Sequence, residues 1–183
     1  MDSSDDLRNS CDIFCEMLLS YNKTHNITGA RDKAHVFENI KDSLFPLHFL
    51  PFSPSSAIDI GSGAGFPAIF LATAIPKCHF ILYEPKPKKS AFLHMVKCEL
   101  KLSNVEIKSK RIEEDKPFVV DMITSRAVGK VKFLIQLSKG FYNENTMMLL
   151  YKGERAKDEI VGLNAQIFSR EKRQYVLLRG FDA

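Results

Sequence analysis

Three glycines at alternate positions carry the clearest chemical signal in this sequence. Gly61, Gly63 and Gly65 follow an apolar stretch, residues 57–60, that is typical of a buried strand, and a run typical of a helix begins at Pro67. A turn between a strand and a helix N-terminus presents backbone N–H groups to a ligand. Glycine is needed there because a side chain would block both the tight turn and the ligand's approach. The stretch therefore predicts a cofactor site lined by backbone.

The spacing of the glycines separates two classes of cofactor. The dinucleotide fingerprint G-x-G-x-x-G would place glycine or alanine where this chain has Phe66. The pattern Asp59-x-Gly61-x-Gly63-x-Gly65 instead resembles motif I of the class I S-adenosylmethionine-dependent methyltransferases. A nicotinamide-dependent oxidoreductase stays open as an alternative, and so does a glycine-rich turn that binds no ligand.

Polar side chains follow the other predicted strands at their carboxyl ends, where sheets of this kind bind ligands. Glu84 comes directly after the second strand and is placed to accept hydrogen bonds from two ribose hydroxyls. Ile112 and Glu113 follow the third strand, Arg126 the fourth and Lys152 the fifth. An arginine at such a rim must be solvated or paired, so we expect Arg126 to meet a phosphate or a carboxylate, such as Glu113 or one of the ligand.

The net charge of +4 is unevenly distributed along the chain. Between positions 86 and 111, eight basic residues are opposed by Glu99 and Glu106 alone, so this segment carries +6 and the rest of the chain −2. A basic stripe beside a cofactor site favours a polyanionic substrate. A solvated helix face would give the same pattern.

The elements that must position these residues alternate between strand and helix. Such alternation predicts an α/β fold with a mostly parallel sheet that is covered on both faces. Two earlier helices, over 7–20 and 32–44, predict an N-terminal helical cap over residues 1–54, with the ligand-binding domain over 55–183. The expected strands are 57–60, 79–83, 105–108, 118–124, 146–151 and 175–179, and the expected helices between them are 66–74, 88–101, 131–139 and 156–168.

Composition is ordinary for one globular domain of 183 residues, 45% of them hydrophobic. No apolar run approaches the length of a membrane span, and the acidic N-terminus lacks a signal-peptide pattern, so we expect a cytoplasmic protein. The histidines have no zinc spacing, and no metal is expected. No C-x-x-C pair occurs, and we expect free, buried thiols within helices or strands at Cys11, Cys15, Cys78 and Cys98.

Several motifs in the same order resemble the bacterial small-subunit ribosomal RNA methyltransferase G family, also called glucose-inhibited division protein B. The resemblance covers nearly the whole chain, although Tyr21 stands where the family usually has tryptophan. The matching segments are Tyr21-Asn22 with Asn26-Ile27-Thr28, the stretch from His35 to Leu44 with Asp42-Ser43-Leu44, the stretch from Asp59 to Pro67, Lys88-Lys89 with Phe92-Leu93, Arg111-Ile112-Glu113-Glu114 and Ser125-Arg126-Ala127.

The resemblance implies a Rossmann-like class I methyltransferase fold and residues with assigned roles. Together with the strand-end argument, it predicts Arg126 as the catalytic residue. The residues expected to contact S-adenosylmethionine are Gly61, Gly63, Gly65, Phe66, Glu84, Ile112, Glu113 and Arg126. Those expected to face RNA are Lys88, Lys89, Arg111 and Lys152.

The implied reaction is methyl transfer to N7 of a guanine in 16S ribosomal RNA. That nitrogen already carries an available lone pair, so its methylation needs alignment and exclusion of water but no general base. The chain has no cysteine after Cys98 that could attack a pyrimidine, and no Asn/Asp-Pro-Pro-aromatic loop for an exocyclic amine. We expect a monomer acting on 16S RNA or the small-subunit particle, without a membrane. Another RNA, a small-molecule acceptor and a non-catalytic RNA-binding module remain as alternatives.

Overall fold

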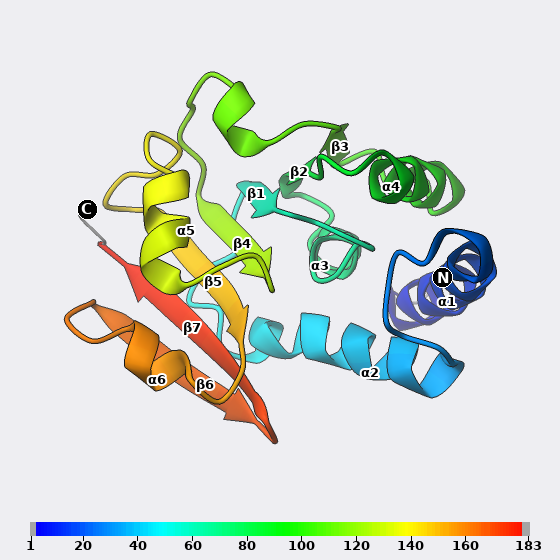
Figure 1. The fold of residues 1–183 in the computed structure, drawn as a ribbon, viewed down its shortest axis with the longest axis horizontal. Helices are drawn as coiled ribbons and strands as arrows, with labels where there is room; N and C mark the ends of the chain where they lie inside the picture. The colour runs from blue at the N-terminus through cyan, green and yellow to red at the C-terminus, as the bar shows by residue number, and fades with distance from the viewer. Residues whose placement is uncertain (1–2, 181–183) are drawn as a thin grey trace.

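A seven-stranded sheet forms the centre of the protein in the computed structural model, which describes residues 3–180. Figure 1 shows the strand order β3-β2-β1-β4-β5-β7-β6. The first five strands in this order, β3, β2, β1, β4 and β5, are parallel to one another. The strand β7 pairs antiparallel with β5, and β6 pairs antiparallel with β7. The strands are β1 (Ser56–Ile60), β2 (His79–Tyr83), β3 (Val105–Lys108), β4 (Met122–Arg126), β5 (Met147–Lys152), β6 (Ala165–Arg170) and β7 (Arg173–Arg179).

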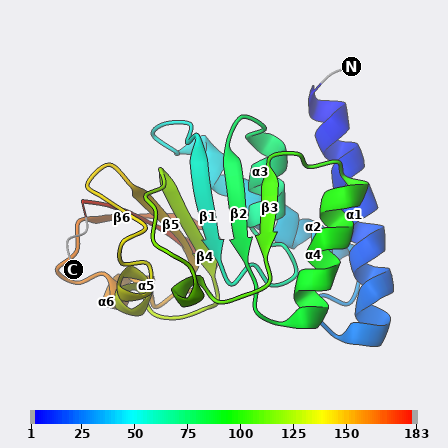
Figure 2. The same ribbon diagram turned by 90° about the horizontal axis from the view of Figure 1, so that it is seen from above.

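Helices cover both faces of this sheet, which confirms the predicted α/β architecture. In Figure 2 the two sets of helices lie on opposite sides of the strands. One set is α1 (Ser3–His25), α2 (Lys33–Leu44), α3 (Ala68–Ala74) and α4 (Pro87–Glu99), and the other is α5 (Val131–Leu137) and α6 (Ala156–Glu159). Two short 3-10 turns complete the described elements, Phe45–His48 and Ile112–Glu114.

The central strands are apolar throughout because each of their faces meets a separate core. In β5, Met147 and Leu149 belong to the core under α1 to α4, whereas Met148 and Leu150 belong to the core under α5 and α6. Successive residues of a strand point to opposite faces, so a sheet covered on both sides requires apolar residues at every position. This is why the strands were visible in the sequence as short continuous apolar runs.

The N-terminal helices share the first of these cores with the sheet. The ring of Phe14 in α1 meets the rings of Phe66 and Phe70 edge-on, at centroid distances of 5.3 and 4.7 Å. Val36 and Ile40 of α2 are buried in the same cluster. This core joins residues on both sides of position 54, where the sequence predicts the end of a helical cap, and the division into two domains stays a prediction.

The predicted helix over 156–168 is correct only in its first turn. The helix ends after one turn at Glu159, and residues 165–170 form β6 instead. Gly162 adopts a left-handed conformation with φ of +81°. This conformation is incompatible with a right-handed helix, so the helix cannot continue through residue 162. Residues 171 and 172 then make a two-residue hairpin turn to β7. The sequence also placed Arg126 after the fourth strand, whereas it is the last residue of β4.

All four cysteines are free, but only Cys11 and Cys15 match the prediction in full. Cys11, Cys15 and Cys78 are buried free thiols, and burial raises the pKa of Cys11 to about 11. Cys78 lies in a bend just before β2 rather than within the strand. Cys98 is exposed, because α4 turns Phe92, Leu93 and Val96 toward the core and leaves Cys98 on its outer face. Within residues 3–180, no helix has the length and apolar character to cross a membrane.

Candidate active site

A cavity of about 450 Å³ opens where the carboxyl ends of β1, β2 and β4 meet. This is the switch point of the sheet, at which the strand order reverses and open α/β sheets bind their ligands. Its size lies within the ordinary range for small-molecule sites, about 300–1,000 Å³. The predicted site residues that line it are Gly61, Gly63, Phe66, Glu84, Lys89, Arg111 and Arg126.

The three glycines of the turn all have positive φ, but their surroundings differ. A Cβ built on Gly61 would lie 2.5 Å from Cγ2 of Val128, so the turn and the loop after β4 could not approach each other as they do. A Cβ on Gly65 would lie 2.9 Å from Cγ1 of Ile69, which is within the core. A Cβ on Gly63 would meet nothing closer than 3.8 Å. Gly63 is therefore open to the cavity, whereas Gly65 serves packing, and its predicted contact with the cofactor stays a prediction.

Glu84 stands at the end of β2, and its carboxylate is held by backbone. The N–H of Gly63 donates to Oε2 over 2.7 Å, and the N–H of Lys86 donates to Oε1 over 2.9 Å. The residue is 4% exposed and lines the cavity. The carboxylate is thus fixed in direction beside the glycine turn, which is the arrangement that the predicted ribose contact requires.

Asp59 lies beneath the glycine turn as an almost fully buried acid. The hydroxyl of Thr124 donates to its Oδ1 over 2.6 Å, whereas Oδ2 has no hydrogen-bond partner among the described residues. Burial raises the pKa of Asp59 to about 6, against the opposing effects of the Thr124 and Ser62 hydroxyls and of the Arg126 charge. An unpartnered buried carboxylate oxygen is uncommon in proteins and is usually explained by a ligand, an ion or a water.

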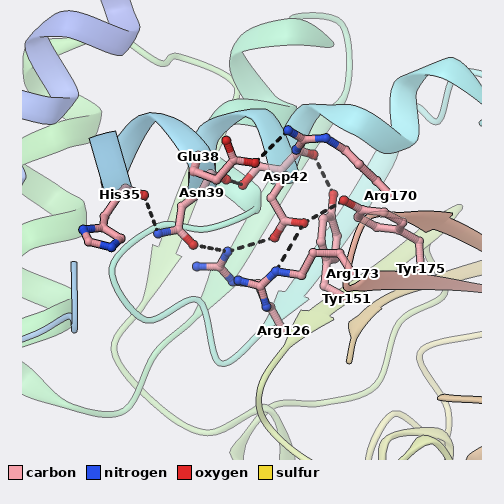
Figure 3. Close-up of polar contacts among 10 residues, drawn as sticks. His35, Glu38, Asn39, Asp42, Arg126, Tyr151, Arg170, Arg173 and Tyr175 are labelled. Carbon is pink, nitrogen blue, oxygen red and sulfur yellow. Dashed lines mark hydrogen bonds and ion pairs between the residues drawn. The ribbon is translucent and has the colours of Figure 1, made fainter. Parts of the chain in front are cut away.

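Arg126 meets a carboxylate, as the sequence predicted, but the acid is Asp42 and not Glu113. Its Nη1 donates to Oδ1 of Asn39 over 2.9 Å and to Oδ2 of Asp42 over 3.3 Å. In Figure 3 the side chains of both acceptors extend from α2 toward the guanidinium. The guanidinium also lies over the ring of Phe66, 4.8 Å from its centroid. Arg126 therefore connects α2, the glycine turn and the cavity.

Besides Gly65, four predicted site residues do not line the cavity. Ile112 is buried in the core under α5 and α6, and Glu113 is exposed. Lys88 is also exposed, and its backbone carbonyl accepts a hydrogen bond from the hydroxyl of Tyr21. Lys152 is bound internally, because its Nζ pairs with Glu159 at 2.7 Å and donates to the carbonyl of Gly129. These placements give no support to the predicted ligand contacts, least of all to an RNA contact by Lys152.

The residues that sequence reasoning missed come from distant parts of the chain. Ile27, Thr28 and Val128 line the cavity, and Asn39 and Asp42 hold Arg126. Asp42 stood within a motif that resembles the family, but nothing in the sequence paired it with an arginine 84 positions away. Within residues 3–180, no group of three or more histidine, cysteine or acidic side chains is arranged to hold a metal ion.

One backbone conformation beside Arg126 is unusual. Ala127 has φ of +59°, in the left-handed region that residues with a Cβ rarely adopt, and it lines the cavity. Such a conformation costs about 1–2 kcal/mol and persists only where the surrounding structure holds it. The loop from Arg126 to Val128 is thus held in shape at the mouth of the site.

Comparison with known proteins decides the family. A family model described as rRNA small subunit methyltransferase G matches residues 8–180. The chain belongs to this family. The ribosomal RNA small subunit methyltransferase G of Campylobacter fetus subsp. fetus is 46% identical over 182 residues, which cover 98% of each chain. That of Campylobacter curvus is 48% identical over 165 residues, which cover 90% of this chain and 87% of the relative.

Solved structures agree on the fold. A ribosomal protein L11 methylase from Lactobacillus delbrueckii subsp. bulgaricus superposes with a TM-score of 0.63 at 11% identity, covering 84% of this chain and 81% of its own. The predicted class I methyltransferase fold, the methyltransferase activity and the S-adenosylmethionine cofactor are therefore confirmed. Membership of the family decides against a nicotinamide-dependent oxidoreductase.

The residues of the site fit S-adenosylmethionine. Gly63 leaves open space where a Cβ would stand, and Glu84 holds a fixed carboxylate beside it. The unpartnered oxygen of Asp59 is an acceptor suited to an ammonium group, and the cation of Arg126 is suited to a carboxylate. With the ring of Phe66, these four residues are the ones that would hold the cofactor.

Proposed function

We propose that this protein transfers a methyl group from S-adenosylmethionine to N7 of a guanine in 16S ribosomal RNA. The observation that carries the proposal is the composition of the cavity wall. Glycine backbone and Glu84 line it together with the basic residues Lys86, Lys89 and Arg111. A polyanion can therefore dock where the cofactor binds, as methyl transfer to RNA requires.

Methyl transfer to N7 requires that the two reactants be aligned, and it requires no proton transfer. Bound S-adenosylmethionine supplies an electrophilic methyl group. Among the described residues that line the cavity there is no histidine or cysteine, and the carboxylate of Glu84 already accepts two backbone hydrogen bonds. The described residues of the cavity lining thus offer no free carboxylate, histidine or cysteine as a general base, which suits an acceptor nitrogen that carries its own lone pair. The work of the chain is to orient the two reactants and to exclude water between them.

The basic stripe over residues 86–111 supplies the docking surface in this proposal. Lys86 and Lys88 are exposed at the start of α4, and Arg111 is exposed and lines the cavity. Phosphates bound there would bring a base that has left its stack toward the methyl group. We expect the protein to act as a monomer in the cytoplasm, on 16S RNA either free or within the small-subunit particle.

The test is a methylation assay with three substrates. The protein is incubated with methyl-labelled S-adenosylmethionine and with unmethylated 16S RNA, small-subunit particles that contain it, or 23S RNA as a control. The RNA is then digested to nucleosides. Labelled N7-methylguanosine from 16S RNA or the particle, and none from 23S RNA, is the expected result. Label in a different nucleoside would overturn the assignment to N7 of guanine. Label in 23S RNA alone, or in no RNA, would overturn the assignment of 16S RNA as the substrate.

A further inference from the structure

The guanidinium of Arg126 is held at one nitrogen by two acceptors from a single helix. Asn39 and Asp42 are three positions apart in α2, so their side chains lie on the same face of that helix. Both accept hydrogen bonds from Nη1, which has two N–H groups and therefore no donor left. The ring of Phe66 lies against the flat face of the group. Together these contacts fix both the rotation and the plane of the guanidinium.

Asp42 is itself fixed by the far end of the chain. The hydroxyl of Tyr175 in β7 donates to its Oδ1 over 2.7 Å, and Nε of Arg173 lies 3.8 Å from the same oxygen. Figure 3 shows these groups arranged around the carboxylate, which is only 2% exposed. A buried carboxylate needs such partners to offset its loss of water. These contacts fix the direction in which Asp42 presents its other oxygen to Arg126.

Other contacts join α2 to the sheet without involving Arg126. The hydroxyl of Tyr151 in β5 donates to the backbone carbonyl of Ser43 over 2.7 Å. Glu38 pairs with Arg170 of β6 at 2.7 Å near the surface. A buried ion pair adds little net stability compared with apolar packing. The pair between Asp42 and Arg126 is thus poorly explained as a device for docking α2.

Arg126 still has donors to offer to a ligand. Among the described residues, none accepts a hydrogen bond from its Nε or Nη2, and the residue lines the cavity with its side chain 19% exposed. Asp59 lies close enough to Arg126 to feel its charge and has one oxygen without a partner. A cation and an anion presented near each other match the carboxylate and ammonium of a free amino acid.

We propose that Asp42, assisted by Asn39, is a positioning residue that aims Arg126 at the carboxylate of the amino-acid tail of S-adenosylmethionine. This inference rests on the proposed function only for its cofactor. It makes α2 a part of the site, since a helix from the N-terminal segment sets the direction of a cofactor-binding cation. Holding one end of the planar fork leaves the other end pre-organised for a carboxylate.

Calorimetry with two cofactor fragments tests this without any methyl transfer. S-adenosylhomocysteine has the amino-acid tail, whereas methylthioadenosine lacks it. We expect Arg126→Ala to raise the Kd of S-adenosylhomocysteine by about ten- to a hundredfold, as for a lost charged hydrogen bond, and Asp42→Asn by about tenfold. The Kd of methylthioadenosine should change by less than about twofold in both variants. Adding Asp42→Asn to Arg126→Ala should cause no further loss, because Asp42 acts through Arg126.

Two variants control for charge and for the docking of α2. Glu38→Gln removes an acid from the same helix, one turn away, and Tyr151→Phe removes another link between α2 and the sheet. Neither should change either Kd. Should Asp42→Asn fail to fold, Tyr175→Phe removes only one hydrogen bond to Asp42 and should show a smaller loss of the same selective kind.

Several results would overturn the inference. One is an equal rise in the Kd of S-adenosylhomocysteine and of methylthioadenosine, and another is an additive effect of Asp42→Asn and Arg126→Ala on the first Kd. A third is a Tyr151→Phe variant that binds S-adenosylhomocysteine as weakly as Asp42→Asn does. The last is an unchanged Kd for S-adenosylhomocysteine with a raised KM for RNA. The last result would assign Arg126 to phosphate. A wild-type protein that binds S-adenosylhomocysteine but methylates no RNA would contradict the proposed function and leave this test unaffected.

Discussion

At the scale of single residues, two glycines of the turn have different roles: Gly63 faces the cavity, whereas Gly65 packs against the core. Gly63→Ala adds a methyl group at the cavity with nothing within 3.8 Å, so we expect a loss of about 1 kcal/mol of stability from its φ and at least about tenfold weaker cofactor binding. Gly65→Ala places the methyl 2.9 Å from Ile69 at φ of +98°, and we expect a loss of about 2–4 kcal/mol. Urea unfolding and calorimetry measure the two properties. Equal losses of both properties in both variants would contradict this division.

Glu84 gives a second prediction at this scale. Glu84→Gln keeps the size and one acceptor oxygen of the side chain but removes the charge that a ribose hydroxyl would meet. We expect the Kd of S-adenosylmethionine to rise by about ten- to a hundredfold, as for a hydrogen bond to a charged group. Glu114→Gln, at an exposed acid outside the cavity, is the control. An unchanged Kd in calorimetry would reject the ribose assignment.

The buried acid of the turn predicts a pH dependence of stability. Burial raises the pKa of Asp59 to about 6 in the folded protein, from an ordinary value of 3.8. Between these values the folded state keeps a proton that the unfolded state has lost, so the free energy of unfolding falls as pH rises. Asp59→Asn has no such proton to lose, so between pH 4 and pH 7 its stability should rise relative to that of the wild type by about 2 kcal/mol. Urea unfolding without cofactor at several pH values measures the difference, and parallel profiles would contradict it.

At the scale of elements, the sequence predicted features that depend on neighbouring residues and missed features that depend on contacts between distant segments. The strands β1, β2 and β5 were visible because each is a short apolar run between turns, and the glycine turn was visible because its geometry demands one residue type. The β6 strand was missed because it lies at the edge of the sheet, where half-buried residues show no strict alternation. The pairing of Asp42 with Arg126 was missed because it depends on how α2 lies across the sheet.

The docking of α2 supports a prediction of its own. The hydroxyl of Tyr151 is buried against the carbonyl of Ser43, so Tyr151→Phe leaves that carbonyl without its donor. We expect a loss of about 1–3 kcal/mol in the free energy of unfolding. Urea denaturation of this variant and of the wild type provides the measurement. An unchanged free energy of unfolding would mean that apolar packing alone holds the helix.

At the scale of the whole molecule, the uneven charge predicts how RNA binding responds to salt. Lys89 and Arg111 line the cavity on the basic stripe, whereas Lys172 lies in the hairpin turn between β6 and β7, at the opposite end of the sheet from β3. Each phosphate contact that is lost should reduce the slope of log K against log salt by about 1. We therefore expect Lys89→Ala and Arg111→Ala to flatten the slope for 16S RNA and Lys172→Ala to leave it unchanged. Filter binding at several salt concentrations measures this, and three identical slopes would place the RNA elsewhere.

The span of one contact has a consequence for how the protein is made. Tyr175 and Asp42 are 133 positions apart, and they meet only when the last strand of the sheet is in place. Synthesis proceeds from the N-terminus, and the early helices leave the ribosome while β7 is still untranslated. A nascent chain therefore carries the glycine turn and Arg126 before it can hold Asp42 in its final orientation. By our inference, the chain reaches its full affinity for the cofactor only after β7 has been made, so a chain truncated before β7 is a poor enzyme.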